Sequence, residues 1–182
     1  MDAVKVNNKL TYDNMGMLVF GDKEPGINSE KTKAVAHFFE KTGVPYQVDT
    51  NMPKRLWGKF MLNVGVNQTV AVYKSNYGEI QREGPARDMM IAAMKEVIAI
   101  SEKEEVYLSE KEDLQYWLDI LSTLSPIGKP SMAQDVDARR YSEVELFAGT
   151  VLEYGKKHGI ATPVNQELYD RIKQIESEYL TF

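Results

Sequence analysis

The chain has 182 residues and a formal net charge of -5, a length that allows one good core or a main domain with a small appendage. The negative charge and the lack of long lysine and arginine runs argue against a protein that binds nucleic acid. Because there is no cysteine and there are only two histidines, disulfides, thiol catalysis and a metal site are not expected. No apolar run approaches the roughly 20 residues of a membrane span, and the first residues lack a signal-peptide core. The sequence therefore predicts a cytoplasmic protein without a membrane partner.

Two short strands are predicted near the start of the chain, over residues 4–10 and 17–20. Turn-forming residues over 13–16 separate them, so we expect the two strands to pair as an antiparallel hairpin. A two-stranded hairpin is only marginally stable in water, and the sequence offers little other β structure on which it could pack. The beginning of the chain therefore resembles the end of a larger αβ domain.

Apolar residues at helical spacing predict a helix over residues 30–42. Asn28 or Ser29 can cap its first turn, and Gly43 is the residue type expected just after its last turn. Residues 44–48 form a predicted edge strand, where a proline is tolerated because an edge position need not donate a hydrogen bond. With the strands before it, this helix makes a small αβ segment.

The rest of the sequence is helical in pattern, and its central element is a predicted helix over residues 53–73. Most residues in its middle are apolar or glycine, but Lys59, Asn63 and Asn67 interrupt the pattern at intervals of four residues. This spacing places the three polar side chains on one side of the helix. Because a lysine and two amides are costly to bury without partners, we expect a polar ligand opposite them. The alternative is that backbone groups satisfy the asparagines and that the lysine stem reaches out to water.

Further helices follow the central one. Methionines and other apolar residues at helical spacing over 89–98 predict a helix that faces the core, with methionine as filler rather than as the lining of a pocket. Ser109 and Glu112 have the spacing of a capping box for the next helix. A helix over 142–157 and a last helix that begins at Pro163 complete the chain.

A loop over residues 124–130 contains two prolines and a glycine, and Ser131 follows it directly. Ser131 can cap the helix that begins at Met132, because its hydroxyl can accept from the amides of the first turn. Equally, a helix N-terminus behind a lysine-containing loop suits a carboxylate ligand. Glu143, near the start of a later helix, can by its position simply complement the helix dipole.

Four segments together resemble one family, because their order and gaps match it. They are Trp57-Gly-Lys-Phe-Met-Leu-Asn-Val-Gly-Val-Asn67, Gly128-Lys-Pro-Ser-Met-Ala-Gln-Asp-Val136, Arg140-Tyr-Ser-Glu143, and His158-Gly-Ile160 followed by Pro163-Val-Asn165. Over residues 17–178 the chain is similar to the C-terminal half of the ketopantoate reductases (2-dehydropantoate 2-reductases). The resemblance implies a mainly α fold, with a helical domain of the 6-phosphogluconate-dehydrogenase-like type over residues 51–182. A small αβ remnant of a Rossmann domain is expected before it, over residues 1–50.

The resemblance implies an oxidoreductase in which Lys59 polarises the substrate ketone and supplies a proton as hydride arrives. An ammonium group suits this task because it can both bind a developing alkoxide and donate to it. The substrate would be a small 2-keto acid, ketopantoate, reduced to pantoate on the route to pantothenate and coenzyme A. NADPH would be the cofactor, with the preference over NADH left open.

Other roles are implied by the same resemblance. Asn63 and Asn67 match positions that hydrogen-bond the oxygens of the substrate, and Ser131 matches the position that holds its carboxylate. Glu143 matches a catalytic glutamate beside the nicotinamide and the substrate, which gives it a second assignment as a cofactor contact. Asp135 lies in the Ser131 motif and is assigned a supporting role.

The sequence departs from the family at its beginning. Such enzymes begin with a Rossmann domain whose Gly-x-Gly-x-x-Gly turn cradles the pyrophosphate, and none of the twelve glycines here has that spacing. We therefore expect a fragment or truncated form that is inactive by itself. The helix faces that would meet the absent domain are expected to be exposed, so a homodimer is a further possibility. Two alternatives stay open as well: a related 2-keto-acid reductase of the same family, and a non-catalytic helical dimerisation module.

Overall fold

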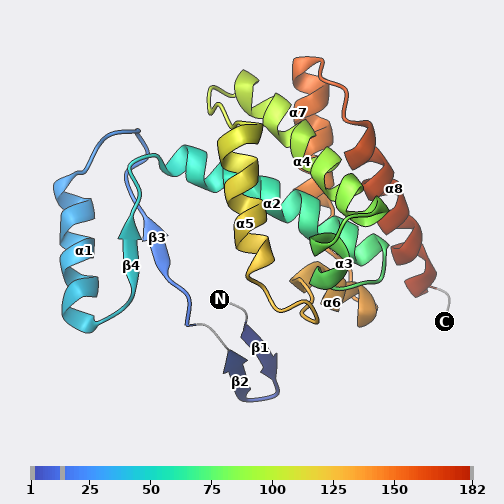
Figure 1. The fold of residues 1–182 in the computed structure, drawn as a ribbon, viewed down its shortest axis with the longest axis horizontal. Coiled ribbons are helices and arrows are strands. Elements are labelled where there is room, and N and C mark those ends of the chain that lie inside the picture. Colours follow the sequence, from blue (N-terminus) through green and yellow to red (C-terminus); the bar gives the residue numbers. More distant parts are fainter. Residues whose placement is uncertain (1–2, 13–14, 181–182) are drawn as a thin grey trace. The chain divides into compact units, whose positions relative to one another are not determined.

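The computed structural model describes residues 3–12 and 15–180 (Figure 1). The chain divides into two compact units, Met1–Arg55 and Leu56–Phe182. The first unit carries short strands and one helix, and the second is built from helices, which confirms the fold class expected from the sequence. Within the part of the chain that the structure describes, no helix has the length and apolar character that crossing a membrane requires.

The first unit begins with a hairpin. β1 (Ala3–Val6) pairs antiparallel with β2 (Lys9–Tyr12), and Asn7 turns the chain with a positive φ of 54°. Asparagine tolerates this left-handed conformation better than most residues, so a two-residue turn of Asn7 and Asn8 can close the hairpin. The turn therefore comes several residues earlier than the sequence analysis placed it.

The strand predicted to complete that hairpin has a different partner. β3 (Leu18–Phe20) pairs with β4 (Tyr46–Val48), and the two strands are parallel. The predicted hairpin across residues 4–20 is wrong, because the local Asn-Asn turn pairs the first strand with its immediate neighbour and releases β3 for a distant partner. Residues 13 and 14 of the predicted turn lie outside the described residues.

α1 (Glu30–Thr42) connects β3 to β4 and confirms the helix predicted there. The Ser29 hydroxyl accepts a backbone N–H of the first turn at 3.3 Å, and Gly43 ends the helix with a φ of 68°. Two parallel strands joined through a helix form a βαβ unit, the kind of connection that parallel strands need. Aromatic rings pack between helix and strands at centroid distances of 5.6 to 6.0 Å, from Phe20, Phe39 and Tyr46.

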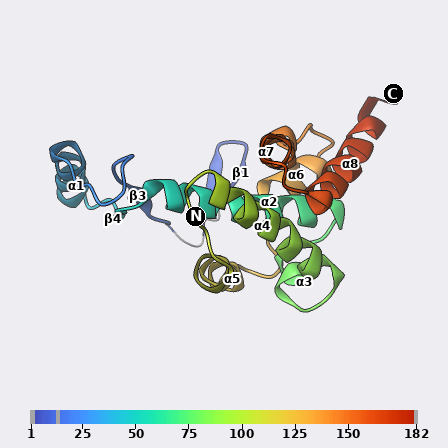
Figure 2. The same cartoon turned by 90° about the horizontal axis from the view of Figure 1, so that it is seen from above.

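α2 (Met52–Val72) runs through the middle of the helices of the second unit in both views (Figure 1, Figure 2). Every residue from Val64 to Val72 is buried, as expected for a helix that packs on several sides at once. The central helix predicted from the sequence is therefore confirmed. The other elements of this unit are α3 (Tyr77–Gln81), α4 (Pro85–Lys103), η1 (Glu110–Leu114), α5 (Gln115–Ser122), α6 (Ser131–Asp137), η2 (Glu145–Gly149), α7 (Thr150–His158), α8 (Pro163–Ser177) and η3 (Glu178–Leu180).

α4 packs closely on α2 at Gly65. Met90 and Met94 of α4 are fully buried, which confirms that the methionine stripe belongs to the core. A methyl group on Gly65 would lie 2.5 Å from Met94 Cγ and 3.0 Å from the Met90 carbonyl oxygen. Glycine at this position therefore lets the two helices approach to a distance at which a side chain would clash.

The helix after Ser109 begins with a π-helical turn, η1. The Ser109 hydroxyl accepts the Glu112 N–H at 3.2 Å, as the capping box predicts. The Ser109 N–H donates to the Asp113 carboxylate at 2.8 Å, and not to the Glu112 carboxylate as the capping box predicts. A π turn holds one more residue than an α turn, so the residue one place further along reaches back to the cap.

The helix predicted over 142–157 begins three residues later, with the π-helical turn η2, and α7 continues it to His158. The helix starts later because the Ser142 N–H donates to the carboxylate of Glu176 at 2.8 Å, which holds Ser142 outside the helix. α8 begins at Pro163 as predicted, and its Leu168 and Ile172 side chains are fully buried.

Candidate functional site

Lys59, Asn63 and Asn67 lie along α2 in order of increasing burial. Lys59 is exposed, Asn63 is half-buried, and only 7 % of Asn67 is accessible to solvent. This order follows from α2, whose second half lies in the core. Among the described residues, Lys59 and Asn63 have no hydrogen-bond or ion-pair partner. The polar groups of these two side chains are therefore available to bind another molecule.

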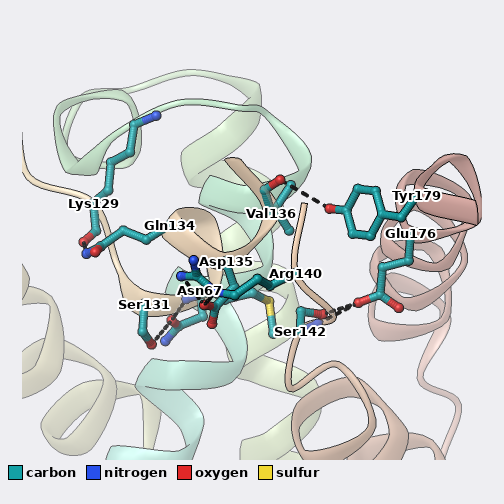
Figure 3. A network of polar contacts seen from close by, with 11 residues as sticks. Asn67, Lys129, Ser131, Gln134, Asp135, Val136, Arg140, Ser142, Glu176 and Tyr179 are labelled. Carbon is teal, nitrogen blue, oxygen red and sulfur yellow. Dashed lines mark hydrogen bonds and ion pairs between the residues drawn. The ribbon is translucent and has the colours of Figure 1, made fainter. Parts of the chain in front are cut away.

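Lys59, Asn63 and Asn67 form the polar stripe of α2, and the N-terminus of α6 meets this stripe at its buried end, Asn67. The Asn67 Oδ1 atom accepts from the Ser131 hydroxyl at 3.5 Å and from the Met132 N–H at 3.4 Å, as Figure 3 shows for Ser131. Asn67 therefore has a polar partner within the chain, as the alternative reading of the sequence expected. The same contact contradicts the capping role considered for Ser131, since Pro130 occupies the N-cap and Ser131 is the first helical residue. Its hydroxyl is turned toward α2 instead.

Asp135 helps to shape the chain that leaves α6. Its Oδ1 atom accepts from Nε and Nη2 of Arg140 at 2.9 and 2.7 Å, and its backbone carbonyl accepts the Arg140 N–H at 2.8 Å (Figure 3). The lysine of the preceding loop, Lys129, is ion-paired with Asp137 at 2.7 Å. Its charge is therefore engaged within the chain, so it lends less support to a carboxylate ligand than the sequence suggested.

Glu143 lies between α6 and η2 and its side chain is exposed. Its carbonyl oxygen accepts the Phe147 N–H at 3.1 Å at the start of η2. No described residue forms a hydrogen bond or ion pair with its carboxylate. The residue before it, Ser142, is held by Glu176 through its N–H and its hydroxyl at 2.8 and 2.7 Å. The glutamate thus has a fixed backbone and a free carboxylate.

An apolar groove of about 290 Å³ lies between α2 and the η2–α7 segment. On α2, Leu56 and Phe60 each precede Lys59 and Asn63 by three residues, a spacing that makes them neighbours on a helix surface. The groove was not predicted from the sequence, although residues 146, 150 and 154 recur every four residues and were a signal for it. Its lining is Leu56, Trp57, Phe60, Leu146, Thr150 and Tyr154.

A charged cluster on the same unit joins the end of α4 to α7. The Glu104 carboxylate lies 2.6 Å from Lys157 Nζ and 2.6 Å from His158 Nε2. The hydrogen bonds from Lys157 and then from His158 hold the pKa of Glu104 below its usual range. A carboxylate with a lowered pKa in the folded state stabilises that state above its unfolded pKa, and the contribution is lost as the pH falls through the folded pKa.

We therefore expect the Glu104→Gln substitution to destabilise the protein at pH 7 but to have little effect at low pH. The difference in unfolding free energy from wild type should shrink between about pH 5 and pH 3. Urea unfolding followed by tryptophan fluorescence measures it, because both tryptophans, Trp57 and Trp117, lie in the second unit. Glu102→Gln, at an exposed neighbouring position, is the control and should show no such trend. A difference for Glu104→Gln that is constant with pH would contradict the assigned ion pair.

The family profile described as "Ketopantoate reductase PanE/ApbA C terminal" matches residues 51–176. The curated 2-dehydropantoate 2-reductase of Aquifex aeolicus (strain VF5) is 28 % identical over 162 residues, which cover 87 % of this chain and 52 % of that protein. The 2-dehydropantoate 2-reductase of Salmonella typhimurium is 31 % identical over 129 residues, which cover 71 % of this chain and 41 % of that protein. The chain thus spans about half the length of the curated relatives it matches.

Solved structures agree with the sequence relatives. The PanE/ApbA family ketopantoate reductase of Ralstonia eutropha JMP134 has a TM-score of 0.77 and 26 % identity, covering 93 % of this chain and 54 % of that one. A D-mandelate dehydrogenase in complex with NADH and anilino(oxo)acetate has a TM-score of 0.73 at 21 % identity, covering 85 % and 51 % of the two chains, and shares the fold. Because the family profile covers more than half of the 182 residues, this chain belongs to the ketopantoate reductase family.

Proposed function

We propose that this chain supplies the substrate-binding and catalytic half of an NADPH-dependent 2-dehydropantoate 2-reductase, which reduces ketopantoate to pantoate. The contact between Asn67 and Ser131 is the observation that carries the proposal. These residues come from two sequence motifs and are 64 positions apart, yet they touch where α6 meets α2. The polar stripe of α2 and the α6 motif therefore share one location, as a common substrate site requires. Family membership and the names of the curated relatives support the same reaction.

Lys59 is assigned as the proton donor. Its exposed ammonium has no ion-pair partner among the described residues, so its three N–H groups are available to a substrate. An ammonium beside a ketone oxygen polarises the carbonyl group and stabilises the negative charge that develops during reduction. Transfer of a proton from Nζ to that oxygen then completes the alcohol.

The other site residues are assigned to binding and orientation. The Asn67 carbonyl oxygen is engaged by α6, so its amide NH2 group is the part that can donate to an oxygen of the substrate. Asn63 can offer both its donor and its acceptor. Ser131 is assigned to the substrate carboxylate, and Glu143 to the reacting centre, where its exposed carboxylate can accept a hydroxyl hydrogen bond. Asp135 is assigned a supporting role through its pair with Arg140.

NADPH would supply the hydride when bound. The residues of this chain do not provide a pyrophosphate cradle, because no Gly-x-Gly-x-x-Gly turn occurs in the sequence. We therefore assign to this chain only the substrate side of the reaction, together with a contact from Glu143 to the nicotinamide. The proton step at Lys59 depends on residues that this chain contains.

We infer that residues 1–50 are the last part of a nucleotide-binding domain and that residues 51–182 form the helical substrate-binding and catalytic domain. The βαβ unit of β3, α1 and β4 supports this inference, because parallel strands joined through helices are the repeating unit of such domains. A homodimer remains a prediction, which sedimentation of the purified chain tests.

A reductase assay tests the proposed function. The chain is joined to the N-terminal half of the Aquifex aeolicus relative and mixed with ketopantoate and either NADPH or NADH. We expect oxidation of NADPH that depends on ketopantoate. Turnover only with a 2-keto acid that carries a larger apolar side chain would assign the chain to a related reductase, which the apolar groove beside Lys59 favours as the second candidate. If no 2-keto acid is reduced, and none raises the melting temperature of the 182-residue chain, the catalytic proposal is wrong.

A further inference from the structure

The connection between α6 and η2, residues 138–144, carries Glu143 and follows the helix that carries Ser131. It forms neither helix nor strand, so its position depends on contacts with its surroundings. One of these contacts is the pairing of Asp135 with Arg140 at its beginning. At its end, the Glu143 carbonyl oxygen accepts the Phe147 N–H. Between these two points the connection is held by the end of α8.

Glu176 makes the central contact (Figure 3). Only 3 % of this residue is accessible to solvent, and its Oε1 atom accepts both the Ser142 N–H at 2.8 Å and the Ser142 hydroxyl at 2.7 Å. Lys173 Nζ lies 3.6 Å from the other carboxylate oxygen. A buried carboxylate is costly unless it is paired and hydrogen-bonded, so these three contacts explain how it is retained. They also fix the backbone of the residue next to Glu143.

The same end of the chain holds the connection at further points. Tyr169 and Lys173 of α8 contact the Glu145 carboxylate at 2.8 and 3.3 Å, just after the connection. Tyr169, Lys173 and Glu176 are spaced by four and three residues, so they project from one face of α8. Before the connection, the Tyr179 hydroxyl donates to the Val136 carbonyl oxygen at 3.2 Å (Figure 3). The connection is therefore held at both ends and in the middle by α8 and η3.

We propose that Glu176 is a positioning residue, which holds Ser142 so that the backbone of Glu143 keeps one place relative to Ser131. The inference rests on the role of Glu143 in the proposed function. Glu176 is 33 residues from Glu143 in sequence and acts only through the connection. A small displacement of a reacting group from its productive position lowers the rate steeply. Loosening the contact between Glu176 and Ser142 therefore lowers turnover without removing any group that touches the substrate.

Amide hydrogen exchange on the 182-residue chain tests the contact without any activity. Hydrogen bonds to a charged acceptor are stronger than neutral ones, so Glu176→Ala should speed exchange of the peptide over 138–144 by about tenfold or more. Glu176→Gln should speed it much less, since a single amide oxygen can accept both bonds that Oε1 now accepts. Glu167→Ala removes an exposed carboxylate of α8 whose only ion-pair partner in the described part of the chain is Arg171, and should leave this peptide unchanged. Equal exchange in wild type and Glu176→Ala would overturn the proposal.

Turnover of the fusion with the Aquifex aeolicus half tests the consequence. Glu176→Ala should lower kcat/KM for the keto acid by about tenfold or more, mainly through kcat, while Glu176→Gln restores most of it. In a Glu143→Gln background, Glu176→Ala should add little further loss, because both act through the same carboxylate. A purely structural role would give equal loss in both backgrounds and would overturn the proposal. An active fusion that Glu143→Gln leaves unchanged refutes the role of Glu143. A fusion that reduces no 2-keto acid, together with a 182-residue chain whose melting temperature no 2-keto acid raises, refutes the proposed function. The exchange experiment decides the contact between Glu176 and Ser142 in either case.

Discussion

Lys59→Ala in the fused enzyme should lower kcat for ketopantoate by about a hundredfold or more, because the ammonium acts mainly in the transition state. The unfolding free energy should stay within about 0.5 kcal/mol of wild type, since the side chain is exposed and has no polar partner among the described residues. Steady-state kinetics and urea unfolding measure the two quantities. This separation of activity from stability distinguishes a reacting group from a structural one.

Two variants control this experiment. Lys59→Arg keeps the positive charge but cannot give up a proton near neutral pH, so it should bind the keto acid and still lose most of kcat. Lys156→Ala, at an exposed position of α7 outside the site, should behave as wild type. A rise of KM alone in Lys59→Ala would make Lys59 a binding residue and remove its role as the acid.

Gln68→Leu should destabilise the second unit by about 2 to 4 kcal/mol. Gln68 is fully buried, and its Nε2 atom donates to the Val64 carbonyl oxygen and to Asn165 Oδ1 at 2.8 and 3.2 Å. Its Oε1 atom accepts the Ala148 N–H at 3.1 Å. A leucine of similar size leaves the Ala148 N–H and the Asn165 amide oxygen without this partner in the core, and each unsatisfied group has a cost. Urea unfolding followed by tryptophan fluorescence measures the loss.

Gln166→Leu is the matched control for Gln68→Leu. The Gln166 side chain is exposed, and among the described residues it donates only to the Asp170 carboxylate one turn away, so its replacement should change the unfolding free energy by less than about 0.5 kcal/mol. The Gln68 side chain connects α2 to η2 through Ala148 and to α8 through Asn165. Similar effects of the two substitutions would show that these hydrogen bonds do not stabilise the second unit. Gln68 was missed in the sequence analysis because it follows Asn67 directly and faces a different side of the helix.

Local chemistry explains which elements could be predicted from the sequence. α1 has its cap at Ser29 and its terminating glycine at Gly43, and both signals act within one turn of the helix they bound. α2 is long and apolar, and α4 has a regular methionine stripe, so their periodicity was sufficient. The pairing of β3 was mispredicted because strand pairing is a choice between partners, and β4 lies about 28 residues further along the chain.

In the candidate site, too, some residues could be assigned from the sequence and others could not. Lys59, Asn63 and Asn67 could be placed on one stripe from their spacing alone, and their motifs pointed to a reductase family that the comparisons then confirmed. Ser131 could not be assigned in this way, since a serine after a proline-containing loop satisfies the pattern of a cap as well as that of a site residue. The structure decided against the cap by placing its hydroxyl on Asn67. The catalytic roles themselves stay predictions.

The sequence by itself determined most of the helices, the polar stripe of α2 and the family, because each depends on residues within a few turns of one another or on motifs in a fixed order. Only the tertiary structure decided which distant groups meet: α6 with Asn67, Glu176 with Ser142, and Leu146 with the groove beside α2. The physical reason is that a buried polar group must find a partner, and the partner that satisfies it depends on how whole helices pack. Helical periodicity gives the face on which a residue lies, but not the element that packs against that face.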